Sequence, residues 1–388
     1  MFTLPIAILS TLLATAPLQA NAAYSLVKDY SGETFFNEWD FYGHYDNLTN
    51  GDANFVNQSA AGQLAYVNDA GNAIIRVSQE EVLYPNKRDT VRIQSQAAYD
   101  QGSVWVYDAL HLPFGCSVWS AMWSQAVNWP SGGEIDTFEG VNLQQTNQMA
   151  LHTTAGCTAV NSSSSVAFDG TLQYPNCDKD ANFNSGCTAT DPNPASYGEA
   201  FAAAGGGMWA TEFASEGIKI WFFTRSEVPS DLSSNASSVD PTSWGTPTFY
   251  VPDSSCNIAE YFSAQHLVID ITLCGDWAGQ NATLAQTGCA LTTQPLCYTQ
   301  YVLDAANYEN AYFEIPSVRV YQDPSVSHTS TSSSDSSSNT TSSSSTNSSS
   351  SGNNNSSSTG TNGTVSRSTN ILAVFATGLA AVGWALLA

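Results

Sequence analysis

Apolar and polar residues alternate in short runs through the middle of the chain, and no stretch of residues 24–323 repeats with the period of an α-helix. Period-two alternation is typical of β-strands that bury one face. The clearest runs lie at 73–77, 90–95, 103–107, 117–123, 148–153, 266–274 and 311–321. Residues 208–213 and 217–224 flank Ser-Glu-Gly and predict a β-hairpin. The pattern therefore predicts an all-β sandwich.

Two stretches of the same region lack this alternation. Residues 24–69 are rich in aromatic residues but hydrophilic between them, which suits short strands and loops. Glycosylation sequons at Asn47 and Asn57 predict that these two residues lie in exposed loops. Residues 155–197 form a long polar excursion with three cysteines. A segment of that length without periodicity usually needs a covalent tie to stay ordered.

The two ends of the chain have the composition of targeting and linker segments. Residues 1–22 read as a signal peptide, because an apolar run ends at Ala-Asn-Ala (20–22) and is too short to cross a bilayer. Residues 325–369 are nearly all Ser, Thr, Asn and Gly, which predicts a disordered, glycosylated stalk. The domain between them should span residues 23–324.

The uncharged apolar tail at 370–388, preceded by small residues near 360–363, is the pattern of a GPI-attachment signal. A transmembrane helix is the alternative, but it would normally be followed by basic residues, and none follow here. We therefore expect a secreted protein that is GPI-anchored at the plasma membrane or cell wall, with no contact to the membrane except through the lipid anchor.

Charge and cysteine content narrow the class of protein further. The formal net charge is −24 with only ten Lys and Arg, which argues against nucleic acid as a partner and suits a neutral polysaccharide. The eight cysteines form no Cys-x-x-Cys pair. An even number in a secreted chain predicts up to four disulfides of open connectivity. Short spacing makes Cys177–Cys187 and Cys289–Cys297 candidate local pairs.

Candidate chemistry is concentrated in the run Gly-Glu-Ile-Asp-Thr-Phe-Glu-Gly (133–140). On a β-strand, alternation places Glu134 and Asp136 on one face and would turn Glu139 to the other. One extra residue, a β-bulge near Thr137 and Phe138, would return Glu139 to the face of the first two acids. Neighbouring carboxyl groups with separated pKa values can supply a general acid and an ionised nucleophile, as a glycosidase requires. An edge strand with solvated acids is the alternative.

Tryptophans close to this run favour a carbohydrate site, because indole rings stack on sugar rings. Trp119, Trp123 and Trp129 lie just upstream, and Trp277 lies further along the chain. The acidic run resembles the Glu-x-Asp-x-x-Glu signature of glycoside hydrolase family 16, in the bulged form of its laminarinase-like members. Further segments that resemble secreted fungal β-glucanases of this family lie at 111–119, 151–154, 196–198, 205–209, 218–223, 244–247, 274–279 and 317–321.

The resemblance covers roughly residues 24–323 and implies a fold and residue roles. It implies a β-sandwich jelly roll of two antiparallel sheets with a concave substrate cleft. It implies retaining hydrolysis with Glu134 as nucleophile, Glu139 as general acid and Asp136 as an assisting acid. His152 is expected beside these acids, although a core histidine is nearly as consistent with the sequence.

Other site residues are weaker candidates. The four tryptophans are candidate sugar platforms, of which we expect two to be exposed. Arg92 is a candidate for contact with a sugar hydroxyl, although an ion-paired arginine fits its setting better. No metal-ligand spacing stands out, and no cofactor or metal at the site is expected. The resemblance leaves open a structural calcium remote from the cleft, which some members of the family carry.

Three functions fit the sequence, and in each the partner is β-glucan and a monomer is expected. The first is an endo-β-1,3- or β-1,3(4)-glucanase, favoured by the bulged form of the motif. The second is a cell-wall glucan transglycosylase that uses the same covalent intermediate, favoured by the surface anchor. The third is a non-catalytic glucan-binding sandwich, since one fold can serve binding alone. The presence of all three acids of the signature argues against this non-catalytic function.

Overall fold

The computed structural model describes residues 23–328 of the chain. The predicted signal peptide (1–22) and tail (370–388) lie outside the described residues, as does the predicted stalk apart from 325–328. Within residues 23–328, no helix is both long enough and apolar enough to cross a membrane.

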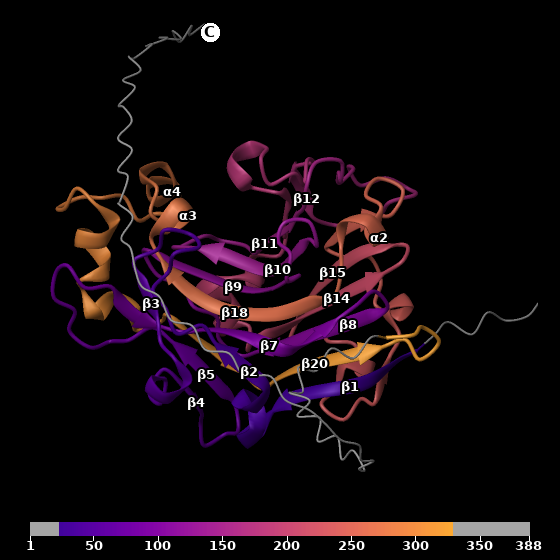
Figure 1. Ribbon diagram of the computed structural model, residues 1–388, viewed down its shortest axis with the longest axis horizontal. Helices are drawn as coiled ribbons and strands as arrows, with labels where there is room; N and C mark the ends of the chain where they lie inside the picture. The colour runs from indigo at the N-terminus through magenta and orange to yellow at the C-terminus, as the bar shows by residue number, and fades with distance from the viewer. Residues whose placement is uncertain (1–22, 329–388) are drawn as a thin grey trace, which may run out of the picture. The chain divides into compact units, whose positions relative to one another are not determined.

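Two antiparallel sheets pack face to face and form a jelly roll (Figure 1). The seven-stranded sheet contains, in spatial order, β16 (Ser238–Val239), β1 (Tyr24–Ser31), β20 (Ser317–Gln322), β8 (Ser103–Ala109), β14 (Gly207–Ala214), β15 (Gly217–Thr224) and β17 (Phe249–Pro252). The eight-stranded sheet contains β12 (Thr171–Tyr174), β13 (Cys187–Thr190), β11 (Gln148–His152), β10 (Glu134–Val141), β9 (Val118–Gln125), β18 (Gln265–Leu273), β7 (Arg92–Tyr99) and β2 (Trp39–Phe41). Its long strands are visibly bent, as Figure 1 shows for β18. The face turned away from the other sheet is called the open face.

Smaller elements complete the domain. A three-stranded sheet contains β19 (Tyr312–Ile315), β5 (Ala73–Arg76) and β4 (Ala65–Val67), and β3 (Ala53–Phe55) pairs in parallel with β6 (Arg88–Thr90). The α-helices are all short: α1 (Gly198–Ala203), α2 (Ile258–Tyr261), α3 (Gly275–Ala278) and α4 (Asn281–Gln286). Their shortness agrees with the lack of helical periodicity in the sequence.

The hydrophobic core fills the space between the two main sheets. Trp105 on β8 and Trp209 on β14 are fully buried on the side of the seven-stranded sheet. Ile135 on β10 and Leu151 on β11 enter the same cluster from the eight-stranded sheet. Large aromatic side chains contribute most of the apolar area buried in such a core. The opposite side of β10, on the open face, is thereby left free for polar residues.

The sequence pattern locates most of the strands correctly, and the hairpin β14–β15 is confirmed. The single strand predicted over 311–321 is wrong, because the chain divides at Pro316 into β19 and β20, which belong to different sheets. Proline has no N–H to donate to a strand ladder, so it suits this change of sheet. The run at 90–95 likewise spans the end of β6 and the start of β7.

Four disulfides pair all eight cysteines, and none is free. Cys177–Cys187 is confirmed, and with Cys157–Cys256 it supplies the covalent tie expected for the excursion at 155–197. The predicted pair Cys289–Cys297 is wrong. Cys289 instead bonds Cys116, and Cys297 bonds Cys274. Sheet formation brings remote segments together, so short sequence spacing was a poor guide to these two pairs.

We expect the disulfides to stabilise the domain according to the loops they close. Loop-closure entropy predicts about 5 kcal/mol for Cys116–Cys289, which joins residues 173 apart, and about 3 kcal/mol for Cys177–Cys187, which joins residues 10 apart. Paired Cys→Ala variants of each bridge, compared by urea unfolding, measure the two costs. Thiol titration of the unfolded, unreduced protein should find no free cysteine. A larger loss from the short bridge would contradict the loop-closure account.

Candidate active site

Strand β10 contains the β-bulge that the sequence predicts. Its pairing slips between Asp136 and Glu139 against β11, and between Asp136 and Phe138 against β9. Thr137 and Phe138 are consecutive, yet both point into the core: the Thr137 hydroxyl lies 2.7 Å from that of Thr211, and the Phe138 ring centroid lies 5.3 Å from that of Trp209. Glu139 is thereby turned back to the open face that carries Glu134 and Asp136.

The side chain of Asn147 fixes this bulge, and sequence reasoning missed it. Its Oδ1 accepts a hydrogen bond from the Glu139 N–H at 2.9 Å, and its Nδ2 donates to the Thr137 carbonyl at 3.1 Å. Asn147 is fully buried, and its own N–H donates to the Ser196 hydroxyl at 2.9 Å. In the sequence it resembles an ordinary turn asparagine between two strands, so no local signal marks its role.

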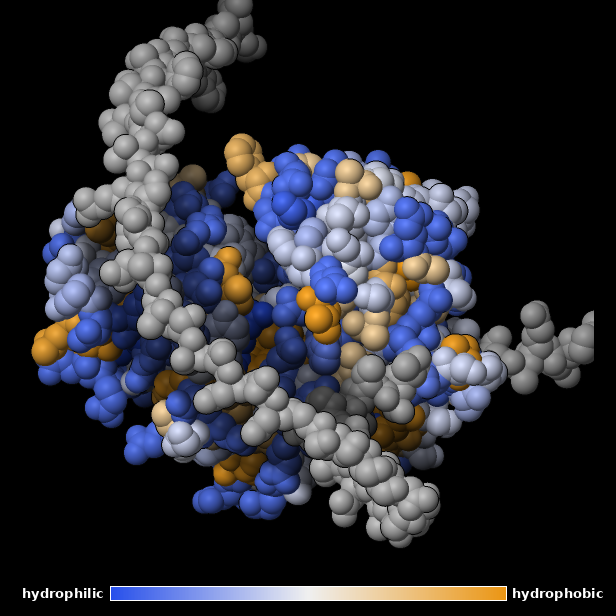
Figure 2. All heavy atoms as spheres, viewed as in Figure 1, coloured by the Kyte–Doolittle hydropathy of each residue, from blue (hydrophilic) through white to orange (hydrophobic). Residues whose placement is uncertain are grey.

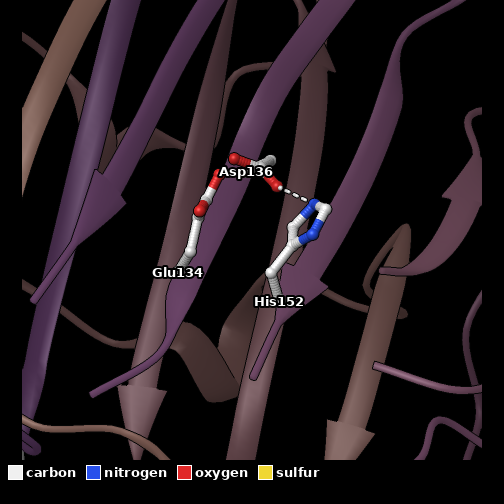
Figure 3. A group of neighbouring side chains, drawn as sticks. All are labelled: Glu134, Asp136 and His152. Atoms are coloured by element: carbon white, nitrogen blue, oxygen red, sulfur yellow. Dashed lines mark ion pairs between the residues drawn. The ribbon is translucent and has the colours of Figure 1, made fainter. Parts of the chain in front are cut away.

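Glu134, Asp136 and His152 form a cluster on the open face (Figure 3). Glu134 and Asp136 come from β10, and His152, directly opposite Glu134 on β11, places Nε2 3.3 Å from Asp136 Oδ2. Burial and the Glu134 carboxylate raise the pKa of Asp136 well above its usual value. Burial alone would lower the pKa of His152, but the charges of Glu134 and Asp136 outweigh it and raise this pKa to about 10. The cluster therefore retains protons at neutral pH.

Glu139 differs from these residues in its surroundings. It is half-buried, and Trp119 Nε1 donates a hydrogen bond to its Oε1 at 2.8 Å. Burial raises the pKa of Glu139 to about 7, although the Trp119 hydrogen bond and the positive charge of His152 oppose the rise. Glu139 can therefore hold a proton close to neutral pH. Glu134 is also half-buried, and it accepts a hydrogen bond from Trp129 Nε1 through Oε2.

The four predicted tryptophans are less exposed than the sequence suggests. Only Trp129 is exposed, at 40%, while Trp119, Trp123 and Trp277 are half-buried. Trp277, on α3, packs edge-on against Trp119 with ring centroids 5.6 Å apart. The expectation of two exposed rings is therefore wrong, because Trp119 donates to Glu139 and packs on Trp277, and Trp123 directs its indole N–H at another acid.

That other acid is Asp270 on β18, which sequence reasoning missed. Its Oδ1 accepts from Trp123 Nε1 at 3.2 Å, and its Oδ2 accepts from the Arg92 guanidinium at 2.8 Å. The same guanidinium lies over the rings of Trp123 and Tyr42, 4.8 and 5.5 Å from their centroids. Arg92 is thus an ion-paired arginine, and its ion pair holds Trp123 in place.

A cavity of about 390 Å³ lies beside this group on the open face, and Figure 2 shows the mostly hydrophilic hollow that crosses the same side of the molecule. Its lining combines amide, charged and aromatic side chains: Asp40, Phe41, Tyr42, Leu48, Arg92, Gln94 and Gln125. The Gln125 amide donates to Gln94 Oε1 at 3.1 Å. Aromatic surfaces mixed with amides and charged groups suit a ligand that is rich in hydroxyl groups.

Within residues 23–328, one group has the geometry to hold a metal ion. Ligand atoms of Glu134, Asp136 and His152 lie within 4.8 Å of one another. A metal ion there would occupy the carboxylate that the sequence assigns as nucleophile. Metal binding and covalent glycosidase chemistry therefore exclude each other at this cluster.

Neighbouring carboxyl groups of different proton affinity are the groups that glycoside hydrolases use to cleave their substrates. Residues 39–321 match the XgeA-like catalytic domain of family GH16. The chain belongs to this glycoside hydrolase family. The acid cluster on β10 lies within the matched residues and is the candidate active site.

Individual relatives agree with this assignment. A probable glycosidase of Schizosaccharomyces pombe is 38% identical over 77% of this chain and 69% of its own length. A probable endo-1,3(4)-β-glucanase of Aspergillus fumigatus is 39% identical over 81% of this chain, which spans about half of that protein. Laminarinase 16A of Phanerochaete chrysosporium, solved with β-glucans in donor and acceptor sites, is 36% identical with a TM-score of 0.72. That match covers 78% of this chain and 100% of the laminarinase.

If Glu139 is the general acid that the sequence predicts, we expect kcat/KM to fall as pH rises through about 7, where Glu139 loses its proton. The Trp119 hydrogen bond stabilises ionised Glu139. Trp119→Phe should therefore raise the pKa of Glu139 and move this falling limb to higher pH, as well as weakening activity. Trp277→Phe is the matched control, since Trp277 packs on Trp119 without a hydrogen bond to Glu139 in the structure. A falling limb that moves to lower pH in Trp119→Phe would contradict this account.

Proposed function

We propose that this chain is a retaining endo-β-glucanase that cleaves β-1,3- or mixed β-1,3/1,4-glucan. The observation that carries the proposal is the bulged strand, which places Glu134, Asp136 and Glu139 on one open face with a proton held near neutral pH by Glu139. The names of the relatives, which include endo-1,3(4)-β-glucanases and a laminarinase, support this substrate class.

Each acid has a role that follows from its surroundings. Glu134 attacks the anomeric carbon and forms a covalent glycosyl–enzyme ester, while Glu139 donates its proton to the departing glycosidic oxygen. Glu139, now ionised, then removes a proton from water, which releases the sugar with its original anomeric configuration. Asp136 and His152 share protons beside Glu134, so they can compensate the change in its charge as the ester forms and breaks.

Transglycosylation is a second candidate, favoured by one observation. An elongating β-1,3-glucosyltransferase of family GH16 is 33% identical to this chain with a TM-score of 0.70. The match covers 77% of this chain and 100% of the transferase. The covalent intermediate is the same in both reactions, and the acceptor decides the outcome. Incubation with laminarin, lichenan and a labelled acceptor oligosaccharide measures the ratio of hydrolysis to transfer.

We expect different rescue behaviour from variants of the two glutamates. Glu134→Ser should almost abolish hydrolysis, yet an α-glucosyl fluoride, which mimics the intermediate, should still be coupled to an acceptor with Glu139 as base. Glu139→Ala should still form the intermediate from donors with good leaving groups, and added azide should then give a β-glycosyl azide. Formation of a β-azide by Glu134→Ser together with an α-azide by Glu139→Ala would instead reverse the two roles. NMR evidence of inversion by the wild type would refute retention.

We propose further that the enzyme is a secreted monomer held at the cell surface by a GPI anchor. The support is the sequence alone: an apolar amino-terminal run, a Ser/Thr/Asn-rich stretch and an uncharged apolar tail. We expect phosphatidylinositol-specific phospholipase C to release the protein from membranes, because that enzyme cleaves the lipid from the anchor. Detection of Trp384 in a C-terminal peptide of the mature protein by mass spectrometry would contradict the anchor.

A further inference from the structure

The open face continues on β11, β13 and β12, on the side of β10 opposite Arg92 and Trp123. Residues paired directly across an antiparallel sheet point to the same face. Asp136 pairs with Ala150 on β11, Ala150 with Thr188 on β13, and Thr188 with Tyr174 on β12. Tyr174 therefore points to the open face, in the same row as Asp136.

A second irregularity in the sheet is what turns Tyr174 to this face. In a regular strand Leu172 and Tyr174 would share a face. The pairing of β12 with β13 slips between them, so Leu172 packs against the core while Tyr174, on the open face, is 46% exposed. The bulge in β12 thus turns an aromatic ring to the open face, as the bulge in β10 turns an acid to it.

The disulfide-closed segment Cys177–Cys187 is held against the same part of the open face. Asn184 places Oδ1 3.3 Å from His152 Nδ1. Gly186 packs so closely on β11 that a Cβ atom there would lie 2.5 Å from the Leu151 carbonyl oxygen and 3.0 Å from the His152 ring. The segment is therefore fixed next to the active site by a covalent bond and by close packing.

The stability of the fold does not explain the exposure and the backbone conformation of Phe183 in this segment. Its side chain is fully exposed, and its φ of 58° lies in the left-handed region, between Asn182 and Asn184, which share that conformation. A bulky residue in that region is strained, and an exposed phenylalanine gains no burial energy in return. Strain that persists next to an active site points to a function that requires it.

We propose that Tyr174 and Phe183 form an additional sugar-binding site, in which their rings stack on units of a β-glucan chain that extends from the active site. The inference rests on the proposed glucanase function. Neighbouring strands lie about 4.8 Å apart, so β12 stands about 14 Å from β10. The Tyr174 ring therefore contacts only chains that extend well beyond the bond being cut, and the site favours long polysaccharide over short oligosaccharide.

The test compares a long substrate with a short one. Tyr174→Ala, Phe183→Ala and the double variant are assayed on laminarin and on an aryl β-glucoside. Aromatic contacts of this kind correspond to about threefold to tenfold in affinity. We expect the ratio of kcat/KM for laminarin to that for the aryl glucoside to fall by this factor, through KM. Tyr84→Ala is the matched control. Tyr84 is 72% exposed, but it lies on the connection between β5 and β6, where its ring packs against that of Tyr298. Its ratio should not change.

Binding measurements separate failure of this inference from failure of the proposed function. Titration calorimetry of Glu134→Gln with a long laminarin oligosaccharide should show about threefold to tenfold weaker binding when Tyr174→Ala and Phe183→Ala are added. Phe183→Gly should leave the melting temperature unchanged or raise it, because it removes left-handed strain. Unchanged Kd and an unchanged kcat/KM ratio in the double variant would overturn the inference. Lack of hydrolysis by the wild type would instead overturn the proposed function.

Discussion

The position of Glu139 depends on the two hydrogen bonds that the Asn147 side-chain amide makes to the bulge in β10. A bulge leaves backbone groups without ladder partners, and buried unpaired groups are costly. Asn147 satisfies one N–H and one carbonyl there. From the core side, the Thr137 hydroxyl contacts Thr211 on the other sheet. The spacing of the three acids is therefore set by contacts on both sides of the strand.

The same arrangement explains how four titratable groups can share one small area. Asp136 and His152 are almost fully buried, and burial opposes the charge of each. Their mutual contact offsets part of that cost, while indole N–H groups donate to Glu134 and Glu139. The pKa values of Asp136 and Glu139 are thus raised by different surroundings, although the two acids lie on a single strand.

Much of the fold and of the active site could be predicted from local patterns. Alternation located the strands, and the Glu-x-Asp-x-x-Glu spacing predicted the bulge, because a regular strand could not have placed Glu139 beside Glu134. The contacts that depend on remote pairing could not be predicted. Asp270 lies on a strand far from the motif in sequence, Cys116 bonds a cysteine 173 residues away, and Asn147 resembles a turn residue. Tyr174 required the register of β12, which a polar segment of irregular pattern does not reveal.

The bond between Cys177 and Cys187 has a consequence for engineering. It joins the two ends of the segment at a Cα separation of 4.1 Å, so the residues between them form a closed loop with its own anchor. Cys187 begins β13, so the pairing of β13 with β11 lies outside that loop. The residues between the two cysteines can therefore be exchanged for other lengths or ring types, provided that Asn184 and Gly186, which pack against β11, are kept. The rim of the open face would change while the acids on β10 kept their neighbours.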